Sequence, residues 1–156
     1  MAQYRDLVAR IRQRIPQASI ATDVIVGFPG ETEAQFERTL SLIEELRFDA
    51  VHVAAYSLRP GTPAARLPDD VPPEEKARRR RLVEELQERI VREINAPLLG
   101  QIVEVLVEGR QRGRWKGRTR NNKLVFFDSR EDWRGRLAKV RITWTGAWSL
   151  VGEVTG

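Results

Sequence analysis

The chain has 156 residues, of which 41% are hydrophobic and 31% are charged, with no cysteine and one histidine. This composition is typical of one folded domain or two small ones, and it excludes disulfides, thiolate catalysis and cysteine-held clusters within the chain. No apolar run has the length of a membrane span or the character of a secretion signal, so we expect a cytoplasmic protein without a membrane partner.

The net charge of +5 is distributed unevenly. Residues 1–97 contain 15 basic and 16 acidic side chains, whereas residues 98–156 contain 12 basic and 6 acidic ones. The excess of positive charge therefore lies after residue 97. This asymmetry predicts two regions with different partners.

The first region has the pattern of a parallel βαβ unit. After a predicted helix over 3–15, apolar runs predict strands over 20–28 and 50–58. Between the strands, a capping box opens a predicted helix over 32–46. The first strand shows no alternation, which is typical of a parallel strand covered on both faces.

A parallel sheet of two strands leaves open edges and an uncovered apolar face. We therefore interpret this region as the end of a larger α/β barrel or as one half of a complex. His52 lies in the second apolar run, and we interpret it as a strand residue without a catalytic role. Because the chain has no other histidine, a histidine-rich metal site is excluded.

The turn Gly27-Phe28-Pro29-Gly30-Glu31 is the first candidate site. Two glycines and a proline fix a tight turn and let the backbone approach another group closely. Ligands of α/β sheets commonly lie at the carboxyl ends of the strands. An ordinary strand-to-helix turn fits the same spacing equally well, and the spacing alone leaves both interpretations open.

A loop rich in proline spans residues 59–73, and a long helix is predicted from 73 to 95. This helix contains four consecutive arginines, 78–81, which one interpretation assigns to nucleic-acid binding. Glutamates flank the run closely, so we favour a solvated, salt-bridged helix face. Pro97 ends the helix and marks a domain boundary.

Short strands are predicted from residue 100 onward. They span 101–108, 112–119, 124–127, 137–144 and 147–154. Five short strands within about 55 residues predict a small closed or nearly closed β-barrel of the oligonucleotide-binding type.

The strongest binding signal is the stretch 110–123, which contains seven basic residues and no acid. Six basic residues occupy every second position, so an extended strand would point them to one face: Arg110, Arg112, Arg114, Lys116, Arg118 and Arg120. Such a row suits a row of phosphates, and its charges would repel one another without a partner. We therefore favour a nucleic acid over a merely solvated surface.

Two aromatic residues accompany this stretch. Trp115 and Phe127 could stack on unpaired bases, as aromatic residues of such barrels often do. Packing inside the barrel is the alternative for Trp115, and the sequence leaves both open.

Three motifs together resemble a known family. They are TDVIVGFPGET at 22–32, YSLRPGTPAA at 56–65 and GRTRNNKLVFF at 117–127. In this order they resemble the radical S-adenosylmethionine methylthiotransferases, and the third motif is most similar to the MiaB-type branch that modifies tRNA. The resemblance covers nearly the whole chain, but only the back part of the family's proteins.

The resemblance implies three parts: the end of a radical S-adenosylmethionine domain over 1–72, a connecting helix over 73–96 and a TRAM barrel that binds RNA over 97–156. The implied fold class is α/β plus β, with one βαβ unit of a partial α/β barrel, a long helix and a five-stranded barrel. The implied activity is a transferase that methylthiolates a prenylated adenosine next to the anticodon.

The resemblance also implies site residues. An S-adenosylmethionine pocket would be lined by Gly27, Phe28, Pro29, Gly30, Glu31, Tyr56 and Ser57. The anticodon stem-loop of a tRNA would be held by Arg110, Arg112, Arg114, Trp115, Lys116, Arg118, Thr119, Arg120, Asn121, Asn122, Lys123 and Phe127. No catalytic residue and no metal ligand is expected in this chain.

The family also uses 4Fe-4S clusters, and the cysteines that hold them are absent here. We therefore expect the chain to bind tRNA, to bind S-adenosylmethionine weakly and not to catalyse alone. Two alternatives stay open: a stand-alone RNA-binding module without catalysis, and a docking subunit that completes a split enzyme with an upstream chain.

Overall fold

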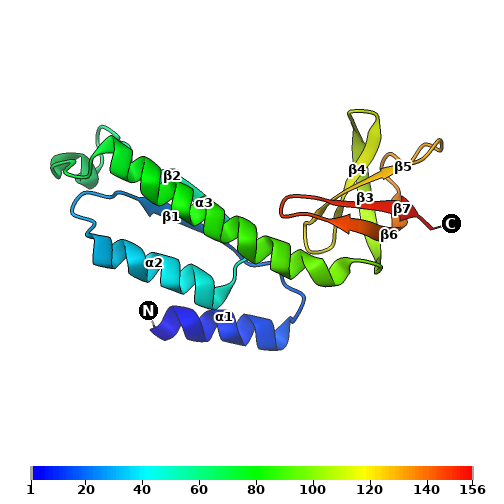
Figure 1. Ribbon diagram of the computed structural model, residues 1–156, viewed down its shortest axis with the longest axis horizontal. Helices are drawn as coiled ribbons and strands as arrows, with labels where there is room; N and C mark the ends of the chain where they lie inside the picture. Colours follow the sequence, from blue (N-terminus) through cyan, green and yellow to red (C-terminus); the bar gives the residue numbers. More distant parts are fainter. Residues whose placement is uncertain (1, 156) are drawn as a thin grey trace. The chain divides into compact units, whose positions relative to one another are not determined.

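The computed structural model describes residues 2–155. The chain divides into two compact units: residues 20–90 form one, and the chain before Ile20 together with the chain from Val91 onward forms the other. Each unit has its own β-sheet (Figure 1). Among the helices of residues 2–155, none has the length and apolar character needed to cross a membrane.

The unit of residues 20–90 is built on a parallel βαβ motif. β1 (Ala21–Val26) pairs in parallel with β2 (Ala50–Ala55), and α2 (Glu33–Leu46) connects them. The predicted capping box opens α2: Gln35 N–H donates to the Thr32 hydroxyl, and Thr32 N–H donates to the Gln35 side chain. The strand-helix-strand prediction is thereby confirmed.

The other helices also agree with their predicted ranges. α1 (Ala2–Arg14) precedes β1, and α3 (Pro73–Asn95) follows the proline-rich loop. That loop contains one short 3-10 turn, η1 (Pro63–Arg66), and a second one, η2 (Ala96–Leu98), follows α3.

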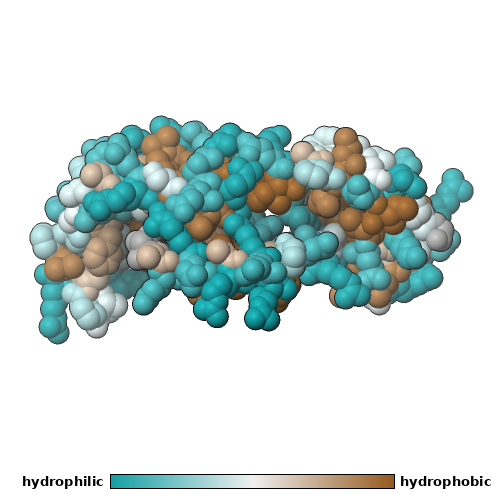
Figure 2. Space-filling model, turned by 90° about the horizontal axis from the view of Figure 1, so that it is seen from below, coloured by the Kyte–Doolittle hydropathy of each residue, from teal (hydrophilic) through white to brown (hydrophobic). Residues whose placement is uncertain are grey.

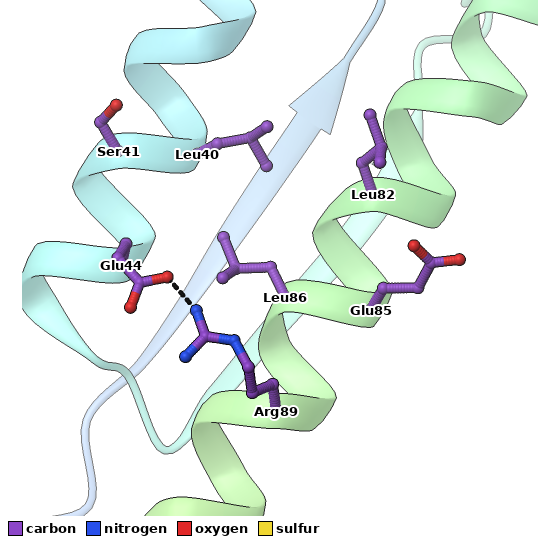
Figure 3. A pocket seen from close by; sticks show the side chains of 7 residues that line it. All are labelled: Leu40, Ser41, Glu44, Leu82, Glu85, Leu86 and Arg89. Atoms are coloured by element: carbon purple, nitrogen blue, oxygen red, sulfur yellow. Dashed lines mark hydrogen bonds and ion pairs between the residues drawn. The ribbon is translucent and has the colours of Figure 1, made fainter.

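α2 and α3 lie on the same face of the two-stranded sheet (Figures 1 and 3). Phe36 and Ile43 of α2 and Val83 of α3 are buried. The stripe predicted for α2 thus packs as expected, and burial of each such side chain contributes roughly 1.5–3 kcal/mol.

The opposite face of this sheet is open. Asp23 and His52, which are partners in the register, are exposed, and Ile25 is 59% exposed. The apolar run of β1 predicted coverage on both faces, and this expectation was wrong for the described chain. The reason is that residues 20–90 supply helices for one face only, as the argument from an incomplete sheet anticipated.

The second unit contains a closed five-stranded barrel in the order β3-β4-β5-β7-β6 (Figure 1). Its strands are β3 (Ile102–Gln111), β4 (Arg114–Thr119), β5 (Leu124–Asp128), β6 (Leu137–Thr145) and β7 (Leu150–Val154). All pairs are antiparallel except β5 with β7. Because β3 also pairs with β6, the sheet has no free edge. The predicted barrel is confirmed.

Alternate residues of the barrel strands fill its interior. The buried cluster comprises Val105, Val107, Trp115, Val125, Phe127, Ala138, Val140, Ile142 and Leu150. Two glycines permit close strand packing inside: a Cβ at Gly117 would overlap the Leu106 carbonyl, and a Cβ at Gly152 would overlap that of Arg141.

We expect Gly117→Ala to lower the free energy of unfolding of the barrel by about 2 kcal/mol, because the added methyl overlaps strand backbone that cannot move without breaking the ladder. Gly109→Ala in β3 is the matched control, since a Cβ there meets open space. Urea unfolding followed by tryptophan fluorescence measures both. Equal stability of the two variants would contradict the close packing of β3 on β4.

Candidate functional site

The turn from Gly27 to Glu31 lies at the carboxyl end of β1. Gly27 and Gly30 have φ angles of 69° and 80°, in the left-handed region that favours glycine. The Gly27 N–H donates to the Glu31 carboxylate at 2.6 Å, and the Gly30 N–H donates to Asp70 at 2.7 Å. Carboxylates of the chain itself therefore hold the turn in shape.

Tyr56 and Ser57 follow β2 and lie beside this turn. The Tyr56 ring contacts the Phe28 ring edge to face, with 5.3 Å between centroids, and its hydroxyl donates to the Ala64 carbonyl. Phe28 remains 41% exposed, and Ser57 is exposed as well. The structure thus brings the seven predicted pocket residues to one end of the sheet, and their contact with a cofactor stays a prediction.

A buried arginine of α3 supports the turn from behind. Arg79 is 5% exposed and donates to Glu31 and Glu75 at 2.8 Å each and to Glu33 at 3.3 Å. Burial acts to lower the pKa of Arg79, but its hydrogen bonds to Glu31 and Glu75 raise it overall. The Glu31 carboxylate is therefore occupied by Arg79 and Gly27, and it positions the turn rather than facing a ligand.

Lys76 is the second buried cation behind the turn. Its ammonium donates to Asp69 at 2.5 Å and lies 5.2 Å from the centroid of the Tyr56 ring. Its stem packs so closely on Gly27 that a Cβ at that position would overlap it. The burial of Lys76 and Arg79 behind this turn was not predicted, because nothing in the spacing of α3 shows which cations point inward.

The run of four arginines in α3 is fully paired. Arg78 contacts Glu75 and Glu33, and the remaining pairs on this run join Arg80 to Glu84 at 2.8 Å and Arg81 to Glu85 at 3.8 Å. The predicted salt bridges of this helix face are confirmed, whereas the prediction that the face is solvated was wrong for Arg79, which is buried.

The donor set does not fit an iron–sulfur cluster. The sequence has no cysteine, and within residues 2–155 no group of three or more histidine, aspartate or glutamate side chains is arranged to hold a metal ion. The chain itself therefore offers no thiolate ligand for such a cluster.

The basic stretch does not form one row. The chain reverses at Arg112 and Gly113, whose φ angles are 50° and 85°, so Arg110 lies in β3 and Arg114 opens β4. The Arg110 guanidinium lies 4.3 Å from the centroid of the Trp115 ring. The prediction of six cations on one face was wrong, because it treated the whole stretch as a single extended strand.

Three cations keep the predicted arrangement. Arg114, Lys116 and Arg118 alternate in β4 with buried Trp115 and Gly117, so they point outward. Arg120 lies beyond the end of β4 and, like Arg112, is exposed.

Neighbouring segments supply carboxylates that the stretch itself lacks. Ion pairs join Arg114 to Asp128 at 3.4 Å, Arg118 to Glu108 at 4.0 Å and Arg120 to Glu104 at 2.9 Å. All six side chains are more than a third exposed, so each pair stabilises the fold by at most about 1 kcal/mol. Within residues 2–155, Arg112 and Lys116 have no carboxylate partner.

The predicted tRNA-binding residues 119–123 form the turn that connects β4 to β5. The Thr119 hydroxyl donates to the Asn121 side chain at 2.6 Å and accepts the Lys123 N–H at 3.0 Å. Asn122 has a φ of 62°, and its carbonyl accepts from Arg118. This geometry explains the residue types as turn formers, and their contact with tRNA stays a prediction.

Trp115 and Phe127 do not fit a stacking role. Both belong to the buried core, and the Trp115 indole N–H donates to the Ser129 carbonyl. A base needs an exposed ring face, so the packing alternative is the correct one for Trp115. Phe126, one residue earlier in β5, points outward and is half-buried.

Sequence reasoning missed further residues on the outer surface of the barrel. Lys139 and Arg141 alternate in β6 with buried Val140 and Ile142, and both are exposed. Their alternation was visible in the sequence, so the signal was available. Trp144 is 52% exposed after a register shift in β6, which no local pattern announces.

The chain is similar to known proteins. A family model described as TRAM domain matches residues 98–155. The chain is 58% identical to the tRNA-2-methylthio-N(6)-dimethylallyladenosine synthase of Roseiflexus sp. (strain RS-1), over 96% of this chain and 32% of that protein. The proteins of the same description from Chloroflexus aurantiacus and Herpetosiphon aurantiacus are 53% and 51% identical, over 97% and 100% of this chain and 34% and 36% of their own lengths.

These similarities confirm the family resemblance inferred from the three motifs. The chain spans about a third of the length of these relatives.

The ion pairs of Glu75 make stability depend on pH. Hydrogen bonds from Arg78, and secondarily Arg79, lower the pKa of Glu75 to about 2 against the opposing effect of burial. The stabilisation is therefore complete above the ordinary carboxyl pKa and is lost as pH falls toward 2. We expect Glu75→Gln to cost about 1 kcal/mol at pH 7, and the difference from wild type to shrink as pH falls from about 5 to 2.

Glu74→Gln is the control, because it removes the same charge from the first turn of α3 without breaking these ion pairs. Urea unfolding at pH 7 and pH 3 measures both variants. A penalty for Glu75→Gln that is equal at both pH values would contradict the lowered pKa.

Proposed function

We propose that this chain, which is related over nearly its whole length to the tRNA-2-methylthio-N(6)-dimethylallyladenosine synthases and carries a TRAM domain, binds RNA through the outer face of β4. The observation that supports this most is the alignment of Arg114, Lys116 and Arg118 on the outside of one strand. Alternate residues of a strand lie about 6.7 Å apart, so these cations form a line suited to a phosphate backbone.

The ion pairs of Arg114 and Arg118 do not oppose this function. Exposed pairs are weak, so phosphates can replace Asp128 and Glu108 as partners at little cost. Among the residues that the structure describes, Lys116 between them has no carboxylate partner to release, so of these three cations it is the most ready for a phosphate.

The RNA we propose is tRNA, bound near its anticodon stem-loop. The support is the name of the related enzymes, which describes a modified adenosine of tRNA. On the same resemblance, we propose that the chain divides into three parts, 1–72, 73–96 and 97–156. We also propose that the protein is cytoplasmic.

Methylthio transfer is proposed only for a protein that adds the other two thirds of such a relative, either in one polypeptide or as an upstream partner chain. The family resemblance implies that S-adenosylmethionine would be the source of the radical in such an enzyme. In this chain, the exposed Phe28 ring and the end of β2 fit one side of a pocket for this cofactor, while Glu31 holds the turn in place.

The open sheet face favours a second candidate function. Ile25 and its neighbours on that face are exposed, and a docking subunit would cover them with a partner's strands or helices. This function needs no RNA, so RNA binding separates the two.

We expect an anticodon stem-loop to bind the chain with a log–log salt slope of about −3 to −5, as neutralisation of four to six phosphates requires. Changing Arg114, Lys116 and Arg118 together to Gln should reduce the slope by about 2 to 3, because three contacts are lost. Fluorescence anisotropy across a salt series measures both.

The charge-matched control changes Arg38, Arg80 and Arg81 of α2 and α3 to Gln, since all three are exposed and belong to the unit of residues 20–90 rather than to the barrel. It should bind like wild type. Absence of binding, or an equal loss in both variants, would overturn RNA binding through β4 and leave the docking subunit as the better candidate.

A further inference from the structure

A row of four residues crosses the outer surface of the barrel from β4 to β6. Lys116 is the register partner of Phe126, Phe126 of Val151, and Val151 of Trp144. Register partners in a sheet point to the same side. The four side chains are exposed or half-buried, whereas the next row inward, which includes Phe127, is buried. Two aromatic rings and a cation therefore share one outer row.

Trp144 faces outward because of a β-bulge. The register shifts between Ile142, which is buried, and Trp144, so two residues of β6 occupy the space of one. Bulges re-aim side chains and are common beside binding sites. Without this bulge, alternation from Ile142 would turn the indole into the core.

The Trp144 ring is also supported from below. It packs against Gly146 so closely that a Cβ there would overlap the ring. The buried Asn95 amide donates to the Gly146 carbonyl at 2.8 Å and to the Ala147 carbonyl at 3.2 Å, which holds the turn in place. The indole is thus fixed in position while half of its surface stays open to solvent.

Single exposed apolar residues are ordinary on protein surfaces. Figure 2 shows small apolar areas among the predominantly hydrophilic side chains of the face in view. The row differs from an isolated patch because its two rings line up across three strands and adjoin the cations of β4.

We propose that Phe126 and Trp144 form a stacking site for the bases of unpaired nucleotides, with Lys116 as the adjoining phosphate contact. This inference rests on the proposed RNA binding and adds the residues that contact the bases of its unpaired segment, which a duplex does not offer. The bases of a duplex are stacked on one another, whereas an unpaired base exposes its ring faces to aromatic side chains. Binding by stacking is tolerant of sequence.

The test uses the full chain and an unstructured single-stranded RNA of about ten nucleotides, with a duplex of equal length for comparison. We expect Trp144→Leu and Phe126→Leu each to weaken single-strand binding by about 5-fold or more. The log–log salt slope should stay unchanged, because no phosphate contact is lost. Wild type should prefer the single strand to the duplex.

Trp148→Leu is the matched control, because Trp148 is 61% exposed but lies in the turn after β6 and outside the row. It should bind within 2-fold of wild type. Bound RNA should quench a fluorescence component that Trp144→Leu abolishes and Trp148→Leu retains. Trp144 is exposed, so its variant keeps the test decisive even if Phe126→Leu impairs folding.

Wild-type affinity in both aromatic variants, with the salt slope of wild type intact, would overturn the stacking site and leave RNA binding through β4 standing. Equal affinity for the duplex and the single strand would also overturn it. Absence of any salt-dependent binding by wild type would instead overturn the proposed function and this inference together.

Discussion

Closure of the barrel is the constraint on which the candidate interface depends. Because β3 pairs with both β4 and β6, each strand has a fixed inner and outer side, and the apolar cluster around Val105 and Phe127 occupies the inside. The cations of β4 then have only the outer surface available. A curved sheet with a packed interior cannot rearrange one strand without disturbing the others, so the cations are presented on a rigid support.

A different interaction organises the unit of residues 20–90. There, Arg79 joins three carboxylates that come from the turn after β1 and from the starts of α2 and α3. Breaking a buried ion pair is costly because the remaining partner is left without compensation. The network therefore couples the ends of three elements that are distant in sequence, and it gives the turn its shape before any ligand arrives.

The sequence was sufficient for the elements and for the barrel, because helical spacing, strand alternation and the capping box are local signals. Prediction from the sequence failed where a single residue decides the direction of the chain or of a side chain. The reversal at Arg112 and Gly113 separates Arg110 from Arg114, and a choice between Phe126 and Phe127 decides which ring is buried. The inward direction of Arg79 depends on tertiary packing, which no periodicity encodes.

Within residues 20–90, helices cover one face of the β1–β2 sheet, and an incomplete sheet with an uncovered face was expected from the sequence. It did not predict that the same few residues would leave polar and apolar side chains side by side. Asp23, Ile25 and His52 share that face. A surface of mixed character is compatible with either a partner or a substrate cavity completed by further strands.

The contact of Lys76 with Gly27 changes the meaning of the glycine-rich motif. A side chain at position 27 is excluded by the stem of a lysine from the same chain, and the left-handed φ disfavours one as well. A glycine would thus be retained there in a homologue that had lost every ligand. A sequence search that uses Gly27 as a signature of cofactor binding would therefore also detect proteins in which this glycine serves only the fold.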